Sequence, residues 1–407
     1  MGAVLPDQYH DGLHPQVSER PRVLLLTPHF PPTQGGIADY ARWLVEELAT
    51  LGFEMRVSTS LSPDSPASAA FSVSATVEHW DGRLWRAVAD EVASFKPDIL
   101  HIEYQQTMYG GDPAIGFLPS ALAARGARLA IVTTLHDMDR SRRGPKLASR
   151  LAFECLLYGS AKLMVSGDSE FHALARRPGI KRRTSVVSVG SNIEVHPLPP
   201  EQRAALRASV SHDDDACLLV FFGLIRPGKG IETLIDAVAD LRRRSVQVEL
   251  IVAGDVGNNE LDARTAYRHR VIERQHIDRL DEVVHFLGRQ PEAEVSRLLQ
   301  ACDLAVLPFD TGSSASHTTI HAVLSHGVPL LTTRGPGTPE MFTDGTLELI
   351  DSPADAQVLS RAIEDLIKQP KRRESMALRG RQLTDRFTRS AIGRQVASVY
   401  REVLDER

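Results

Sequence analysis

Cysteine, basic charge and long apolar runs are all scarce in this chain of 407 residues. The three cysteines, Cys155, Cys217 and Cys302, are far apart and each lies among apolar neighbours. A disulfide framework or a zinc site is therefore not expected, and we interpret these side chains as buried, reduced thiols. Acidic residues outnumber basic residues by 52 to 47, which gives a formal net charge of -5. Because nucleic-acid-binding proteins usually carry a basic excess, small molecules are the expected partners, and nucleic acids are not.

The apolar segments are too short for a membrane-spanning protein. None approaches the roughly 20 consecutive residues that a transmembrane helix needs. The opening residues, MGAVLPDQYHDGLHPQ, are polar and interrupted by prolines, unlike a secretory signal. We therefore expect a cytoplasmic protein in which residues 1–21 are flexible.

Strand-like apolar runs alternate with helical segments from about residue 22 to the end, which predicts an α/β fold with parallel sheets. The alternation occurs twice, first from RVLLLTP to TSVVSVG and again from CLLVFFG to LELID. We predict two domains, residues 22–195 and 216–385, joined by a linker at 196–215 that is proline-rich and then acidic. Residues 386–407 are expected to form a helix that packs back on the first domain.

Two loops containing glycine follow predicted strands, at the end of the sheet where ligands of open α/β folds bind. The stretch HFPPTQGGIADYA places Gly35 and Gly36 at the start of a helix, where free backbone N–H groups and the helix dipole favour an anion. A plain turn explains a pair of glycines equally well. The stretch FFGLIRPGKGIETLIDAV repeats the arrangement and adds Lys229. Two such sites in two domains suggest a ligand held in a cleft between them.

The second loop has part of the signature of a phosphate loop, because residues 223–229 match G-x-x-x-x-G-K. A phosphate loop needs Ser or Thr directly after the lysine, since that hydroxyl binds the magnesium ion of the nucleotide. Gly230 occupies this position, so hydrolysis of a triphosphate is not expected.

Six segments occur in the order and approximate spacing seen in family 4 glycosyltransferases, and the chain resembles that family from about residue 22 onward. They are TPHFPPTQGGIADYARWLVEEL, TTLHD, FFGLIRPGKGIETLIDAV, VVHFLG, DLAVLPF and HGVPLLTT followed by GTPEMFTDG. The resemblance implies the GT-B fold, in which two Rossmann-like domains with parallel sheets face one another across a cleft. It also implies retaining transfer of a sugar from a nucleotide-diphosphate-sugar donor, with no metal and no other cofactor. Lys229 would then neutralise the leaving diphosphate, as magnesium does in a phosphate loop.

The chain departs from the family pattern beside this lysine. Many members have an arginine directly after the glycine of the strand-end loop, where this chain has Leu224. Arg226 lies two residues later and is the candidate second cation, although it can equally point to solvent.

The larger departure is the loss of two glutamates. The family pattern E-x7-E, which the resemblance assigns to the donor's sugar and ribose, is replaced by Ser314 and Ala322. A subgroup pattern P-F-x-x-G-x-S-x-R-R-x-S matches this region in part, but Ser316 and His317 stand where its arginines would be. Donor recognition is therefore expected to use hydroxyls, imidazole and the backbone N–H groups of a helix start.

The resemblance completes the set of candidate site residues. His136, at the end of the strand in TTLHD, is expected near the transferred sugar, although a lone histidine is more often structural. The catalytic candidates are Lys229, His136 and Arg226. The donor-binding candidates are Gly35, Gly36, Gly223, Ser314, Ser316, His317, Thr318 and Thr319. The acceptor-binding candidates are Glu103, Tyr104, Asp137 and Asn192, and no metal ligand is expected.

Two other functions stay open. An NAD-dependent dehydrogenase is compatible with Rossmann-like domains, but the nearest match to G-x-G-x-x-G is GPGTPE, whose last position is Glu340. A binding protein that kept the fold and lost catalysis is compatible with the missing glutamates.

Membrane association is a further possibility, which we expect less. Two basic runs, at 140–146 and 175–183, would suit an anionic surface. We interpret them as solvated loops, because neither is flanked by a recognisable amphipathic helix with exposed aromatic residues.

Overall fold

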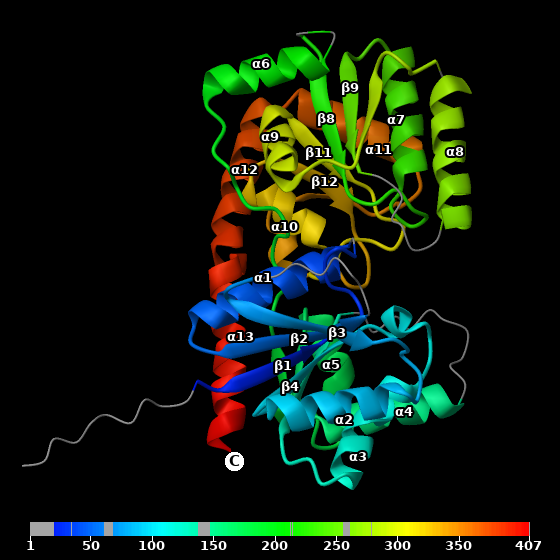
Figure 1. Cartoon of the computed structure of the whole chain (residues 1–407). Coiled ribbons are helices and arrows are strands. Elements are labelled where there is room, and N and C mark those ends of the chain that lie inside the picture. The colour runs from blue at the N-terminus through cyan, green and yellow to red at the C-terminus, as the bar shows by residue number, and fades with distance from the viewer. Residues whose placement is uncertain are drawn as a thin grey trace, which may run out of the picture.

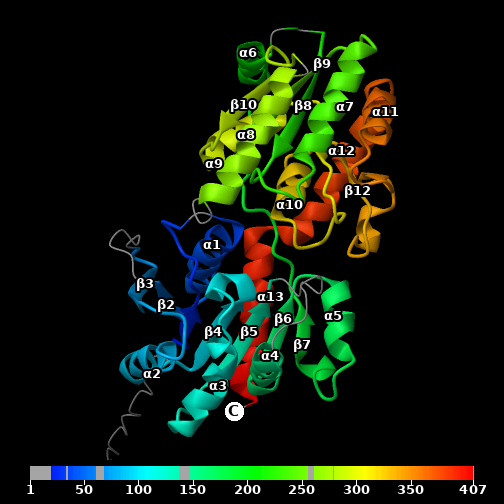
Figure 2. The same ribbon diagram turned by 90° about the vertical axis from the view of Figure 1, so that its right-hand side faces the viewer.

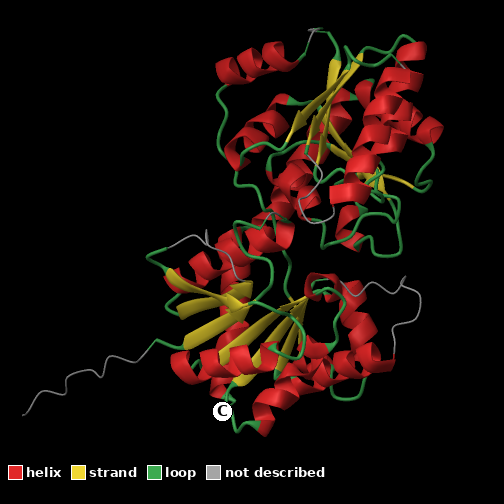
Figure 3. Cartoon of the chain, turned by 45° about the vertical axis from the view of Figure 1, so that its right-hand side comes forward, coloured by secondary structure: helices red, strands yellow, loops and turns green. Residues whose placement is uncertain are grey.

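The computed structural model describes residues 20–33, 35–60, 68–136, 147–211, 213, 215–254, 261–277 and 279–406. They form two α/β domains, one above the other in Figure 1, each built on a parallel sheet with helices on both sides (Figure 3). The strand order is β3-β2-β1-β4-β5-β6-β7 in the first domain and β10-β9-β8-β11-β12-β13 in the second. The prediction of two α/β domains with parallel sheets is confirmed.

The first domain contains the seven-stranded sheet. Its strands are β1 (Arg22–Leu26), β2 (Glu54–Ser60), β3 (Phe71–Val77), β4 (Ile99–Tyr104), β5 (Ala130–Leu135), β6 (Lys162–Val165) and β7 (Thr184–Val186). Its helices are α1 (Gly36–Thr50), α2 (Leu84–Phe95), η1 (Gln106–Tyr109), α3 (Ala114–Ala124), α4 (Leu147–Gly159), α5 (Asp168–Ala175) and η2 (Lys181–Arg183). The central strands β4 and β5 are buried along their whole length, as expected of parallel strands with both faces covered.

The second domain contains the six-stranded sheet. Its strands are β8 (Cys217–Phe222), β9 (Val248–Ala253), β10 (Val284–Gly288), β11 (Leu304–Leu307), β12 (Leu330–Thr333) and β13 (Glu348–Ile350). Its helices are α6 (Pro200–Val210), α7 (Ile231–Arg243), α8 (Leu261–Ile277), α9 (Glu292–Ala301), α10 (Thr318–Ser325), η3 (Glu340–Phe342), α11 (Ala356–Ile367), α12 (Pro370–Thr384) and η4 (Asp385–Phe387).

The last helix, α13 (Arg389–Asp405), leaves the second domain and lies along the first, as Figures 1 and 2 both show. Its apolar face, which includes Ile392, Val396 and Tyr400, is buried in the same cluster as α1 and strand β1. The opposite face of the first sheet is covered by α2, α3 and α4, and the second domain has a separate core.

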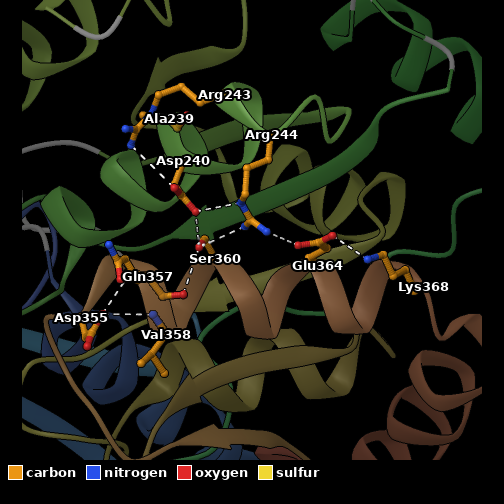
Figure 4. A network of polar contacts seen from close by, with 10 residues as sticks. All are labelled: Ala239, Asp240, Arg243, Arg244, Asp355, Gln357, Val358, Ser360, Glu364 and Lys368. Atoms are coloured by element: carbon orange, nitrogen blue, oxygen red, sulfur yellow. Dashed lines mark hydrogen bonds and ion pairs between the residues drawn. The ribbon is translucent and has the colours of Figure 1, made fainter.

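Helices α7 and α11 show how polar contacts fix the outer layer of the second domain (Figure 4). Ser360 Oγ donates to Asp240 Oδ2 at 2.7 Å, and Arg244 pairs with both Asp240 and Glu364. Asp355 caps α11 by accepting from two backbone N–H groups of its first turn. These contacts hold the two helices in a fixed register on the sheet.

Two elements were not predicted from the sequence. Strand β3 pairs only with β2 at the edge of the first sheet and was absent from the predicted strands. The span 196–215, predicted as a linker, contains α6, which packs on α9. The helix begins at Pro200, whose fixed φ suits the first helical position and whose missing N–H costs nothing there.

Two smaller expectations need correction. All three thiols are free, but only Cys302 is fully buried, while Cys155 and Cys217 are partly exposed. The run at 140–146 does precede a helix with exposed apolar side chains, because α4 exposes Leu147 and Tyr158. Among the described residues, no helix combines the length and apolarity that a bilayer crossing would require.

Candidate active site

A cavity of about 540 Å³ lies between the two domains, at the carboxyl ends of strands β1, β8 and β9. Both domains contribute to its wall. The lining residues are Gly35, Gly36, Asp39, Arg42, Trp43, Glu46, Asn192, Ile193, Phe222, Gly223, Leu224, Arg226, Lys229, Ala253, Gly254, Arg289, Gln290, Glu292, Val295, Thr318, Thr319 and Arg389. This is the crevice in which ligands of open α/β sheets bind.

The wall formed by the first domain is the start of α1. Gly35 precedes the helix and has a φ of 146°, a backbone angle that residues other than glycine rarely adopt. A Cβ atom on Gly36 would lie 3.6 Å from Thr318 Oγ1, so the first turn of α1 faces the first turn of α10 across the cleft. Two helix N-termini with free backbone N–H groups therefore point into one space, an arrangement that suits an anion.

The wall formed by the second domain begins where β8 and β9 end side by side. The Gly223 N–H donates to the Ala253 carbonyl at 3.1 Å, and a Cβ atom on Gly254 would lie only 1.8 Å from the Gly223 carbonyl oxygen. Gly223 itself has a φ of 138° and lies against Thr319. Only glycines allow the two strand ends to approach this closely.

Lys229 lies in the loop that leads from Gly223 into α7. Gly230 caps this helix with a φ of 70° and is packed against the Pro308 carbonyl, which fixes the position of the lysine. The ammonium group is 4.6 Å from the centre of the Phe309 ring, within the range of a cation–π contact. Burial lowers the pKa of Lys229 to about 7, and the nearby Arg226 contributes.

His317 also lies against Phe309, with its ring tilted and its ring centre 4.1 Å from that of Phe309. Burial, followed by the charges of Lys229 and Arg226, holds the pKa of His317 well below its usual value. The ring is therefore neutral. Because its Nδ1 accepts from the Ser314 N–H at 3.3 Å, its Nε2 carries the proton and is a hydrogen-bond donor.

Three buried polar atoms of the cleft residues have no hydrogen-bond partner among the described residues. They are Trp43 Nε1, Asn192 Oδ1 and Thr319 Oγ1. Buried polar atoms in folded proteins are almost always paired, so unpaired ones beside a cavity indicate a place for ligand or water.

A cluster of charged residues forms part of the cleft wall near Asn192. Asp39 of α1 lies near Arg289, Glu292 and Arg389, and burial raises the pKa of its carboxyl while the arginines oppose the rise. Arg389 also pairs with Glu292 at 2.6 Å and donates to the carbonyl of Asn192 at 3.2 Å. Residues from α1, α9, α13 and the crossover between the domains therefore meet at this point.

Eight of the candidate residues line the cleft together: Gly35, Gly36, Asn192, Gly223, Arg226, Lys229, Thr318 and Thr319. Ser314, Ser316 and His317 directly precede α10 and do not line the cavity. The hydroxyls of Ser314 and Ser316 are hydrogen-bonded to each other at 2.7 Å. Asp137 lies outside the described residues.

Glu103, Tyr104 and His136 lie within the first domain and not in the cleft wall. Glu103 is fully buried and hydrogen-bonds through Oε2 to His136 Nε2. Tyr104 stacks on Tyr109 in the apolar core.

Several cleft residues were missed by the sequence analysis, notably Asp39, Arg42 and Trp43 of α1 and Arg289 after β10. The α1 residues share a helix face at the spacing i, i+3 and i+4, so this spacing in the sequence could have identified them. Arg289 follows directly after a strand, so the strand-end rule that found Lys229 would also have found it.

A second hollow, of about 360 Å³, lies on the second domain beside β13 and α12 and is lined by Arg334, Arg372 and Arg379. Each arginine already has a partner: Arg334 pairs with Asp351 at 2.7 Å, Arg372 pairs with Glu348, and Arg379 donates to a backbone carbonyl. The hollow has contributions from one domain only, and we do not consider it the active site. No group of three or more metal-binding side chains occurs within the described ranges.

Comparison with known proteins places both halves of the chain. The family described as "Glycosyl transferase 4-like domain" matches residues 35–190, and the family "Glycosyl transferases group 1" matches residues 202–383. The D-inositol 3-phosphate glycosyltransferase of Frankia alni is 25% identical over 395 residues, covering 91% of this chain and 95% of that protein. The alpha-D-kanosaminyltransferase of Streptomyces kanamyceticus is 28% identical over 203 residues, which are 50% of each chain.

Solved structures share the fold at low identity. Sucrose-phosphate synthase from Thermosynechococcus elongatus aligns with a TM-score of 0.77 at 19% identity, covering 95% of this chain and all of that one. The Anabaena protein Alr3699/HepE in complex with UDP-glucose aligns with a TM-score of 0.74 at 19% identity, covering 94% and 99% of the two chains. With the two family matches, one in each domain, and the inter-domain cleft, these findings establish that the chain belongs to the family 4 glycosyltransferases of the GT-B fold.

Proposed function

We propose that the protein is a retaining glycosyltransferase that moves a sugar from a nucleotide-diphosphate donor to a hydroxyl or amine of an acceptor. One observation carries this proposal: Lys229 stands at the start of α7 beside Gly223, with the first turns of α1 and α10 opposite. Three sources of positive potential thus converge where a diphosphate would lie. A nucleotide donor is supported by the UDP-glucose bound in the HepE structure.

In this proposal the second domain binds the donor and the first binds the acceptor. The bond between the anomeric carbon and the diphosphate oxygen breaks and leaves an oxocarbenium-like centre, while the bonding electron pair passes to the diphosphate. Lys229 and Arg226, with the backbone N–H groups at Gly36 and Thr318, stabilise the charge that develops on the phosphate oxygens. The acceptor's oxygen or nitrogen then bonds to the anomeric carbon on the face that the diphosphate left, while a phosphate oxygen takes the acceptor's proton, so the configuration at the anomeric carbon is retained.

The cationic role needs no metal here, because Lys229 supplies a positive charge in place of magnesium. A lysine with a pKa near 7 in the empty cleft becomes fully protonated once a polyanion binds beside it. We assign Asn192, which lines the cavity, to the acceptor side. We also assign His136 to the acceptor side, beside the transferred sugar, although it follows β5 and is not one of the residues that line the cavity.

The missing glutamates favour one alternative, a protein that binds nucleotides without transferring sugar. Neither Ala322 nor Ser314 has a carboxylate. Ala322 is fully buried in α10, and the Ser314 hydroxyl is hydrogen-bonded to that of Ser316. We propose that the Nε2–H of His317 and the Thr319 hydroxyl take over the donor contacts.

The experiment is a thermal-shift titration with UDP, GDP, ADP, dTDP and their common sugar conjugates. A ligand at about 100 times its dissociation constant stabilises a protein by roughly 2.7 kcal/mol. We expect one nucleotide series to stabilise the wild type and not Lys229→Ala. Lys368→Ala is the matched control, because Lys368 is exposed, pairs with Glu364 on α11 and does not line the cleft.

Turnover decides between transfer and binding alone. With the stabilising donor and a panel of acceptors, Lys229→Ala should reduce turnover at least about a hundredfold, the scale of losing one preorganised donor to a developing anion. Near-normal turnover in Lys229→Ala would overturn the role of the lysine. Binding of a nucleotide-sugar without any product from the wild type would establish the non-catalytic alternative.

A further inference from the structure

A carboxylate buried between two histidines is the most unusual group outside the cleft. Glu103, at the end of β4, has no exposed surface. Its Oε2 is hydrogen-bonded to His136 Nε2, and its Oε1 lies 3.5 Å from His101 Nε2 without forming a hydrogen bond. An ionised carboxylate in the interior costs several kcal/mol unless it is paired. Such groups are usually kept because a site needs them.

The other groups around Glu103 are neutral. Tyr40 of α1, Tyr109 of η1 and Tyr400 of α13 all lie close enough for its charge to act on them. The Tyr109 hydroxyl donates to the backbone carbonyl of Glu103, at 2.7 Å, and leaves the carboxylate alone. Among the described residues, the carboxylate therefore has no cationic partner other than an imidazole.

Of the two imidazoles, His101 is already engaged. Its Nδ1 is 2.6 Å from the Tyr400 hydroxyl and its Nε2 is 2.7 Å from Thr134 Oγ1. Burial lowers the pKa of His101, so its ring is neutral. The hydrogen bond that satisfies Glu103 thus comes from His136, whose Nε2 must carry the proton. Burial alone would raise the pKa of Glu103, but the neighbouring imidazoles of His101 and His136 and the hydrogen bond from His136 outweigh it, so the pKa of Glu103 lies below its usual value.

We propose that Glu103 is a positioning residue for His136. Its carboxylate fixes the His136 ring with Nε2–H directed into the domain and leaves Nδ1 as the nitrogen that contacts the substrate. The inference rests on the proposed function in one respect, that His136 contacts the transferred sugar or the acceptor. It changes the role of Glu103, because a fully buried carboxylate behind a histidine cannot touch an acceptor. The edge of Tyr40 against the His136 ring, with centres 5.3 Å apart, restrains the same orientation from the other side.

A double-mutant cycle separates positioning from simple stabilisation. Glu103→Gln keeps the size of the side chain and removes its charge, and we expect about a ten- to hundredfold loss of kcat, as for other residues that orient a functional histidine. The KM for the donor should stay within about twofold, because in the proposed function the nucleoside diphosphate of the donor is bound by the other domain. In a His136→Ala background the same substitution should change kcat by less than about twofold, since Glu103 then has nothing to position. Multiplicative losses in the double mutant would overturn the proposal.

Tyr400→Phe is the matched control. It removes a buried hydroxyl from the same network, but that hydroxyl bonds to His101 and not to the Glu103–His136 pair. We expect a lower melting temperature with kcat within about twofold of the wild type. If Tyr400→Phe lowers kcat as strongly as Glu103→Gln at matched stability, the network is structural and the proposal fails.

A readout independent of turnover covers the case in which Glu103→Gln does not fold or the wild type transfers no sugar. The ¹⁵N chemical shifts of the His136 ring in the wild type report its tautomer directly, and we expect a protonated Nε2 and an unprotonated Nδ1. A protonated Nδ1 with a bare Nε2 would overturn the assignment whatever the activity. An expected tautomer in a wild type that transfers no sugar would instead count against the proposed function and leave the positioning geometry standing.

Discussion

At the scale of single residues, the cleft is organised around one aromatic ring. Phe309 contacts both the Lys229 ammonium group and the His317 ring. Two cations this close would repel each other, and the structure avoids this by keeping His317 neutral. The lysine is then the group whose charge responds to the ligand. A buried cation that has a lowered pKa and, among the described residues, no carboxylate partner is suited to an anionic ligand.

The lowered pKa of Lys229 predicts a pH dependence of binding. In the empty protein the amine loses its proton as the pH rises through about 7, whereas a bound diphosphate raises its pKa and retains the proton. Affinity for the nucleoside diphosphate should therefore weaken between pH 7 and 9, and binding at pH 8 should take up part of a proton. Calorimetric titrations in buffers of different ionisation enthalpy measure this uptake. Proton uptake that persists in Lys229→Gln would show that another group is responsible.

The same shift has a consequence for the stability of the empty protein. Because the folded-state pKa of Lys229 is below that of the unfolded chain, the unfolded state binds more protons between about pH 7 and the ordinary lysine value of 10.5. This residue therefore makes the protein more stable as pH rises through that interval, the opposite of its effect on ligand binding.

Residue-level prediction from the sequence worked where backbone geometry dictates the residue. Gly36, Gly223 and Lys229 follow strands, and the strand-end rule placed them at the cleft. The same rule also placed Glu103 and His136 in the site, but it says nothing about which way a side chain turns. The Glu103 side chain is buried on the face of the sheet that α1 and α13 cover, near Tyr40 and Tyr400, and these helices are distant from β4 in sequence.

At the scale of elements, the start of α7 is held by a close approach that tolerates only glycine. Gly230 has a φ of 70°, and a Cβ atom there would lie 1.8 Å from the Pro308 carbonyl oxygen. Gly228 has a φ of 90°, but a Cβ atom there would meet nothing within 4 Å. The two glycines flank Lys229 and differ only in crowding.

This difference predicts distinct outcomes for two substitutions. Both Gly228→Ala and Gly230→Ala place a side chain in the left-handed region, at about 1–2 kcal/mol each. Gly230→Ala must also push the loop away from Pro308, and we expect it to weaken nucleoside-diphosphate binding at least about tenfold by moving Lys229. Gly228→Ala should stay within about threefold. Titration of both variants by calorimetry tests this, and equal losses would mean that the φ angle alone matters.

Prediction of elements from the sequence failed where local pattern and tertiary context disagree. Strand β3 follows a small polar stretch and pairs on one side only, so it lacks the continuous apolar run of the buried strands. In the span around α6, the prolines indicated a linker, whereas Pro199 and Pro200 in fact precede and start a helix. The helix is held by packing on α9 and by the Arg207–Asp303 ion pair, which no local pattern reveals.

At the scale of the whole molecule, the chain crosses between the domains twice, and its last helix, α13, lies on the first domain. α13 follows the last helices of the second domain but completes the core of the first, against α1 and β1. The sequence analysis expected a helix at 386–407 that packs on the first domain, but the residues of α1 and β1 that it contacts are not visible in the sequence. Arg389, at its first residue, ties this return to Glu292 of the second domain. α13 therefore connects the two walls of the cleft, because it packs on the first domain and its Arg389 pairs with Glu292 of the second.

This connection predicts where a core substitution in the last helix is felt. Ile392 is fully buried in the first-domain cluster, and Ile392→Ala should destabilise the protein by about 2–5 kcal/mol. Leu378→Ala on α12 is the control, since Leu378 is 60% exposed and its loss should matter by no more than about 0.5 kcal/mol. Hydrogen exchange in Ile392→Ala should accelerate in β1 and β4, although Ile392 follows the second domain in sequence, and remain slow in β8 and β9. Acceleration confined to the second domain would show that α13 belongs energetically to the domain from which it emerges.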